Sequence, residues 1–449
     1  MDRILLLVLL TFQLGRLIIL YIGHKEVKFL WVSFFLISVP LEIERALTND
    51  KYQGMTGTLT PIYQLSVPVI ICCILLLFKS KASDVLAFKF NNWATLTLLI
   101  LLISLVNPYN ENFTASGAFI LFFISHILLF KIFSSSMDYN QIVKGFFDGF
   151  FILCACQFIL AICFPLLGII SVTNLFHVGG QEAATRFGSR DGAIGFFIHP
   201  GPLALFTMIA SSFFVATFSY NYNKKLSLLM LILNGITIIL TYSRTSYIAF
   251  VLVIAFLFFI RKNYNKNIFS IANLFKFILP SVLFLGWLIF LSPLKSAFLE
   301  SDVGNQVGNR VIHYLMAYEM FKSSPFIGVG INAHLTYVAT HPAILSSITK
   351  TNETIDFYRN NPIHNSHLTI LAETGLIGFI SWVIFILRNI VVSKNQIAKH
   401  YNPILSLTFI GTLVTIIVYG LTGWAALANG ILPFFLIIAF FAIKYRTAK

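Results

Sequence analysis

Residues 360–367 read Asn-Asn-Pro-Ile-His-Asn-Ser-His, and at this point a long polar segment gives way to an apolar run. The polar segment starts near residue 292, and the apolar run after residue 367 is long enough to cross a bilayer as a helix. Most of the remaining chain is apolar in segments of similar length. The pattern predicts a helical membrane protein in which residues 292–366 form one large loop outside the bilayer.

The composition excludes an ordinary soluble domain. Of the 449 residues, 57% are hydrophobic and only 11% are charged, whereas soluble domains carry about 25% charged residues. The alternating pattern of a membrane β-barrel is absent, so backbone groups in lipid must be paired within helices. We therefore predict an all-α integral membrane protein, a single polytopic domain over residues 1–449 with about 12–13 transmembrane helices.

The expected spans alternate with short basic loops. They cover residues 4–22, 28–44, 62–78, 93–106, 116–133, 148–172, 196–218, 226–241, 245–260, 274–291, 367–387, 404–420 and 425–443. Because Lys and Arg gather in cytoplasmic loops, the bias places the large loop, the loops 45–61, 107–115 and 173–195, and the turn 242–245 on the outer side. An early span could instead be interfacial, which leaves the side of the N-terminus open. The net charge of +14 is spread over many loops, so we expect no nucleic-acid partner.

Cysteines and carboxylates predict neither a disulfide framework nor a metal centre. All five cysteines lie inside apolar runs and read as buried small side chains. The outer loops contain no His-Glu-x-x-His pattern and no cluster of carboxylates for Mg²⁺ or Mn²⁺. We therefore expect no metal and no cofactor.

Two arginines and a histidine are the main candidates for chemistry. Arg244 lies between two apolar segments, and Arg310 opens an amphipathic stretch (309–321) in which it shares a helical face with His313. His364 precedes a helix whose N-terminus faces outward. Arginines beside helix N-termini favour a phosphate, and a histidine there can move a proton. Each also has a plainer interpretation: Arg244 can reach lipid phosphates, Arg310 can face water, and a lone loop histidine is usually a surface residue.

Further polar residues are weaker candidates for a role in the site. Arg186 and Arg190 lie four residues apart in the glycine-rich loop 173–195, and His199 opens the next helix. Glu373 lies about two turns into the helix that follows the large loop. Its plainer role is a polar contact between helices; its alternative role is in an ion pathway, as in a transporter.

Four stretches resemble the superfamily of O-antigen ligases and O-antigen polymerases. They are residues 362–368 followed by 371–378, the Ser-Arg-Thr turn at 243–245, the amphipathic stretch 309–321 followed by the Gly-x-Gly turn 325–330, and, more weakly, residues 186–188 with 199–200. The resemblance is most specific over residues 186–380, which we treat as the family-like core region.

The resemblance implies a GT-C type glycosyltransferase at the outer face of the bacterial cytoplasmic (inner) membrane. The implied donor is a glycan on undecaprenyl pyrophosphate, and catalysis in the ligases is metal-independent. By motif match, Arg244 and Arg310 would bind the pyrophosphate, and His364 would act as base or orient the acceptor hydroxyl. Arg186, Arg190, His199, His313 and Asn365 would bind substrate.

We favour a polymerase of lipid-linked repeat units for O-antigen, capsule or another surface polysaccharide. The alternative enzyme is a ligase that transfers polymer to lipid A core or another acceptor, and the non-enzyme alternative is a lipid-linked oligosaccharide flippase or transporter. The expected partners are the lipid-linked oligosaccharide, a glycan or lipid A core acceptor, membrane lipids and a chain-length regulator. Phe-rich spans such as 146–164 are expected to line the groove for the lipid tail.

Overall fold

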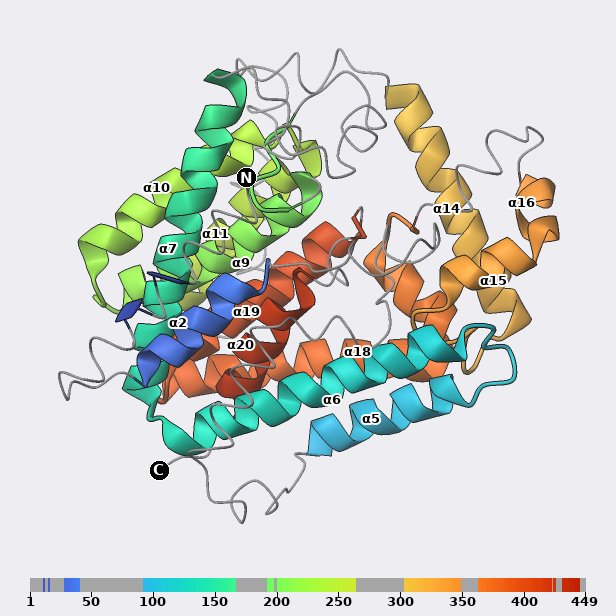
Figure 1. Cartoon of the computed structure of the whole chain (residues 1–449), viewed down its shortest axis with the longest axis horizontal. Helices are drawn as coiled ribbons and strands as arrows, with labels where there is room; N and C mark the ends of the chain where they lie inside the picture. Colours follow the sequence, from blue (N-terminus) through green and yellow to red (C-terminus); the bar gives the residue numbers. More distant parts are fainter. Residues whose placement is uncertain are drawn as a thin grey trace.

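Every regular element among the described residues is a helix (Figure 1). The computed structural model describes residues 11–12, 15–16, 28–40, 92–166, 192–197, 200–263, 303–348, 362–421, 423–424 and 430–444. The helices are α2 (Phe29–Ser38), α5 (Asn92–Leu105), α6 (Phe113–Ser136), α7 (Tyr139–Leu166), α9 (Pro200–Ser219), α10 (Lys224–Leu240), α11 (Arg244–Asn263), α14 (Val303–Ser323), α15 (His334–Thr340), α16 (Pro342–Ile348), α18 (Ser366–Ala398), α19 (Pro403–Gly420) and α20 (Leu432–Lys444).

Six of the described helices are long and apolar enough to cross a bilayer. They contain the segments Phe113–Lys131, Tyr139–Cys163, Pro200–Ser219, Thr245–Asn263, Ser366–Ala398 and Pro403–Gly420. This confirms the all-α integral membrane fold. The total of about 12–13 spans stays a prediction, because the expected spans 62–78 and 274–291 and most of 4–22 lie outside the described residues. Two expected spans belong to longer helices: the helix that contains most of 148–172 already begins at Tyr139, and the span expected at 367–387 continues as a helix to Ala398.

Phenylalanine side chains on three helices form a central part of the core of the bundle. Phe146 and Phe150 of α7 contact Phe213 of α9, and Phe150 and Phe206 contact Phe434 of α20. All five side chains are fully buried. Buried aromatic side chains of this size contribute strongly to packing. The expectation that span 146–164 lines a lipid groove is therefore wrong for Phe146 and Phe150, which are interior residues.

An ion pair explains two polar residues in apolar segments. Both terminal guanidinium nitrogens of Arg16 donate to Asp148, each at 3.0 Å, and Ser33 Oγ donates to the same carboxylate at 2.7 Å. A charge inside a membrane bundle is costly unless it is paired. Arg16 and Asp148 therefore tie the N-terminal segment to α7.

The helices of the large loop, α14, α15 and α16, lie together at one end of the bundle, over the start of α18 (Figure 1). They enclose a small core of their own, made of Met316, Met320, Val329, Val338, Ile363 and Ala372. The connection between α5 and α6 meets them there: Asn107 Nδ2 donates to the carbonyl oxygen of Ile327 at 3.3 Å, and Asn112 Nδ2 donates to Thr336 Oγ1 at 2.8 Å. The loop 107–115 and the large loop therefore lie on the same side of the bundle, as the charge bias predicts.

Helix α18 is broken at Gly375, where φ is 62° and ψ is −166°. The turn 325–330 fills this break. Before the break, the amides of Val329 and Gly330 donate to the carbonyls of residues 372 and 373 at 2.9 and 3.0 Å; after it, the amide of Leu376 donates to Pro325 at 2.9 Å. Backbone groups within a bilayer must be paired internally, and here the turn 325–330 supplies the partners that the broken helix lacks. We call Gly375 together with its flanking hydrogen bonds to the turn 325–330 the helix break.

Candidate active site

The site forms where α14 meets the loop that precedes α18. The imidazole ring of His313, on α14, stacks on that of His364, with ring centroids 4.7 Å apart and planes inclined by 12°. His313 is buried and His364 is half-buried. Arg310 lies one helical turn before His313 on α14 and is partly exposed. The structure therefore brings His364 together with Arg310 and His313, which come from a segment about fifty residues earlier in the sequence.

Backbone contacts fix the orientation of His364. Its Nδ1 donates to the carbonyl oxygen of Pro362 at 3.0 Å. A carbonyl oxygen can only accept a hydrogen bond, so Nδ1 must be the donor: in the neutral ring the proton is on Nδ1 and the lone pair is on Nε2. His364 can thus offer Nε2 to a hydroxyl group.

Asn365 holds His364 in place. Its Oδ1 accepts from the amides of His367 and Leu368, both at 3.0 Å, and so caps the N-terminus of α18. Its Nδ2 donates to the carbonyl of Leu421 at 3.0 Å, beyond the end of α19. Both ends of the amide are used within the protein, so these contacts give Asn365 a structural role; substrate binding by Asn365 stays a prediction.

The two stacked histidines are held neutral. Burial, and then the charges of His364, His334 and Arg310, lower the pKa of His313 to about 3. Burial lowers the pKa of His364 to about 4; the hydrogen bond to Pro362 opposes this shift and the charge of Arg310 adds to it. At neutral pH both rings can accept hydrogen bonds, and Arg310 is the cation beside them.

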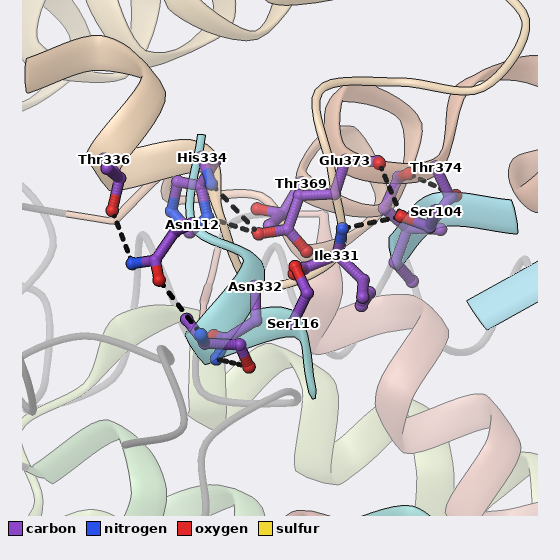
Figure 2. A network of polar contacts seen from close by, with 12 residues as sticks. Ser104, Asn112, Ser116, Ile331, Asn332, His334, Thr336, Thr369, Glu373 and Thr374 are labelled. Atoms are coloured by element: carbon purple, nitrogen blue, oxygen red, sulfur yellow. Dashed lines mark hydrogen bonds and ion pairs between the residues drawn. The ribbon is translucent and has the colours of Figure 1, made fainter. Parts of the chain in front are cut away.

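The sequence did not predict a buried contact between a histidine and a glutamate that lies beside these histidines. His334 Nδ1 contacts Glu373 Oε1 at 2.6 Å, and both side chains are almost fully buried (Figure 2). The residues come from α15 and from α18 just before the helix break. Glu373 stood in the family-like stretch, but nothing in the sequence distinguished His334 from an ordinary loop histidine.

The remaining predicted residues are placed only in part. Arg244 is the first residue of α11 and follows a turn in which Tyr242 has φ of 51°, so the turn expected at 242–245 is present. The structure describes the backbone of Arg244 alone. Arg186, Arg190 and His199 lie outside the described residues. Their roles stay predictions.

A cavity of about 870 Å³ runs along α18 between α5, α6 and α20. At one end it reaches Ser366 and His367, next to His364; at the other it reaches Gln396 and Lys444. Its walls are mainly apolar and include Ile370, Trp382, Phe385 and Phe435. The cavity thus extends from the first residues of α18 to the opposite end of the long helix; Arg310, His313 and His364 do not line it.

The described residues contain no group of three or more His, Cys, Asp or Glu side chains arranged to hold a metal ion. The expectation of a metal-independent site remains a prediction. What the described site does provide is a fixed cation, two neutral imidazole rings and a buried carboxylate. This set suits the binding of an anion beside a hydroxyl group.

Comparison with known proteins identifies the segment that carries the site. Residues 229–383 match the family model Wzy_C, described as O-antigen ligase. The matched segment contains α11, α14, α15, α16 and the part of α18 that includes the helix break. A comparison with curated proteins found no match. The match over residues 229–383 supports the resemblance to the superfamily of O-antigen ligases and O-antigen polymerases, a family of glycan-transferring enzymes, and the six apolar helices indicate a multi-pass membrane protein.

Proposed function

We propose that this protein transfers an undecaprenyl-pyrophosphate-linked glycan to an acceptor hydroxyl and thereby polymerises surface-polysaccharide repeat units. The observation that carries the proposal is the position of Arg310 beside the stacked pair of His313 and His364. We place the reaction at the outer face of the bacterial cytoplasmic membrane, with a chain-length regulator as a further partner.

The chemistry needs little beyond these groups. The acceptor oxygen forms a bond to the anomeric carbon. The bond from that carbon to the pyrophosphate oxygen breaks, and undecaprenyl pyrophosphate leaves with the electron pair. Arg310, and Arg244 as predicted, would stabilise the charge that develops on the leaving group. His364 Nε2 would orient the acceptor hydroxyl or take its proton. We infer that fixed cations make a metal unnecessary for this step.

The long cavity beside α18 suits the polyprenyl chain of the donor. One end of the cavity is lined by Ser366 and His367, which closely follow His364 in the sequence, so a donor with its pyrophosphate at Arg310 would extend its lipid toward this end. Ser381 lines the cavity, whereas its neighbour Ile380 is 51% exposed and does not. The two positions therefore form a matched pair for testing this placement.

Ser381→Trp is expected to raise KM for the lipid-linked donor roughly tenfold, about 1.4 kcal/mol, because the indole would occupy the space of the lipid. Ile380→Trp should leave KM unchanged. Initial rates with lipid-linked repeat units would measure both. Equal KM values for the two variants would place the lipid elsewhere.

One observation favours the ligase as a second candidate. The matching family model is itself described as O-antigen ligase. A ligase would use the same donor and the same cation, and would differ in its acceptor, such as lipid A core. The site described here accommodates both reactions, so the product must distinguish them.

Surface glycan from a deletion strain that expresses His364→Ala separates these possibilities. On a gel, we expect a single repeat unit on its acceptor and loss of the ladder of longer polymers, because the acceptor hydroxyl is no longer oriented. General acid–base and positioning groups raise reaction rates roughly a hundredfold or more. Full-length polymer that stays on undecaprenyl pyrophosphate would indicate a ligase.

The control is His341→Ala, which alters an exposed histidine on the same loop. Its ladder should match the wild-type ladder. A normal ladder from His364→Ala as well would remove the histidine from the reaction.

A further inference from the structure

The pair His334–Glu373 has the geometry of a carboxylate-backed base. The carboxylate Oε1 accepts from Nδ1 of the ring at 2.6 Å and lies 3.4 Å from the amide nitrogen of the same histidine. A carboxylate on Nδ1 fixes that nitrogen as the protonated one and leaves the lone pair on Nε2. The same pairing orients histidines that act as general bases elsewhere.

The far nitrogen of His334, Nε2, has no partner in the part of the chain that the structure describes. Nε2 is buried and makes no hydrogen bond to any residue that the structure describes. An unpaired buried polar atom costs about 1–3 kcal/mol, and such atoms in folded proteins call for an explanation. A bound substrate hydroxyl would satisfy it.

The pair is held rigidly. The carbonyl oxygen of Glu373 accepts from the amide of Gly330 at 3.0 Å, and Ser104 Oγ donates to the same oxygen at 3.4 Å while it accepts from the amide of Ile331 at 2.6 Å (Figure 2). Three chain segments therefore fix the backbone on either side of the pair. A base must be held in place in this way to be effective.

His334 also lies beside the stacked histidines. It is close enough to His313 for electrostatic interaction between the two rings to contribute to the lowered pKa of His313, after burial and His364. His364, by contrast, has a neutral carbonyl on its Nδ1 and the charge of Arg310 nearby, and the pKa of His364 is about 4. A ring with so low a pKa is a weak base, although it can still orient a hydroxyl.

We propose that His334, backed by Glu373, is the proton acceptor for the glycosyl transfer, and that His364 orients the acceptor hydroxyl. The inference rests on the proposed function. As the acceptor oxygen bonds to the anomeric carbon, its proton passes to His334 Nε2, and the pyrophosphate leaves with the electrons of the broken carbon–oxygen bond. The negative charge of the Glu373 carboxylate then stabilises the imidazolium, which later releases its proton to water.

His334→Asn tests the inference most directly. The amide nitrogen of asparagine can replace Nδ1 as donor to Glu373, but the variant has no basic nitrogen in place of Nε2. With the full-length protein in nanodiscs, we expect turnover of the lipid-linked repeat unit from the deletion strain to fall roughly a hundredfold or more. Binding of undecaprenyl pyrophosphate alone should remain within twofold of the wild type, because Arg310 is unchanged.

Glu373→Gln provides a second variant that keeps the shape and an acceptor oxygen but removes the charge. Turnover should fall roughly tenfold to a hundredfold, as for other outer-shell carboxylates, and Glu373→Asp should restore part of it. The matched control is the exposed pair of His341 and Glu111, joined at 3.4 Å. His341→Asn and Glu111→Gln should turn over like the wild type.

The possible failures are distinct. If the wild type does not consume the lipid-linked repeat unit, the proposed function falls and this inference falls with it. If the wild type is active and both His334→Asn and Glu373→Gln keep more than a tenth of its turnover, the pair is structural and the proposed function stands. If both variants lose binding of undecaprenyl pyrophosphate in proportion to turnover, the pair serves donor binding and does not accept the proton.

Discussion

Arg310→Ala is expected to lower kcat/KM for glycan transfer by at least about a thousandfold, or roughly 4 kcal/mol. The reason is electrostatic. Arg310 lies close enough to both His313 and His364 for its charge to lower their pKa values, and those rings are neutral near pH 7. The variant would therefore lose the positive charge from a site that developing negative charge on pyrophosphate must occupy.

Two further variants sharpen this test. Arg310→Lys keeps the charge but loses the planar fork that can hold two phosphate oxygens, so it should recover only part of the activity. Lys322→Ala removes a cation at the other end of the same helix, where Lys322 pairs with Glu319 in solvent, and should leave transfer unchanged. Purified proteins assayed with lipid-linked repeat units would give the three values. Wild-type kcat/KM in Arg310→Ala would show that the site lies elsewhere.

Gly328→Val is expected to destabilise the folded protein by several kcal/mol and to reduce its amount in the membrane. Gly328 has φ of +71°, a conformation that disfavours any side chain, and a Cβ there would lie 2.2 Å from the carbonyl carbon of Glu373. Backbone atoms cannot move aside cheaply within the helix break. The substitution should therefore separate the turn 325–330 from α18.

The matched control is Gly117→Ala in α6, where a Cβ would meet no atom within 4 Å. Its melting temperature in detergent should equal or slightly exceed that of the wild type, since alanine favours a helix. Gly375→Ala should resemble Gly328→Val, because its Cβ would lie 2.3 Å from the carbonyl carbon of Phe326. If the melting temperature of Gly328→Val equals that of the wild type, the helix break does not stabilise the fold.

Much of the fold was predictable because the bilayer imposes simple requirements. Apolar length identified α6, α7, α9, α18 and α19 as spans, and charge bias placed the loops of one side together. The break in α18 was not predicted, because Gly375 stands in an apolar run that reads as continuous helix. Its partners lie some fifty residues earlier, in the turn 325–330, and hydrophobic periodicity contains no information about such pairing.

The site was predicted in part for a similar reason. Helical spacing put Arg310 and His313 on one face, and the motif around His364 identified the third residue. The stacking of His313 on His364 and the pairing of His334 with Glu373 depend on how α14 and α15 pack on α18. Those contacts join distant segments, and a single sequence does not specify them.

The helix break also limits how this enzyme can be engineered. The outer loop and α18 share backbone hydrogen bonds on both sides of Gly375, so neither is a separable module. A chimera that carries the loop of a relative, for instance to change acceptor choice, would combine the relative's turn with the break in α18 of this protein, and the two would not match. Swaps should therefore transfer residues 325–330 and 372–377 together, and the loop alone should be a poor unit of recombination.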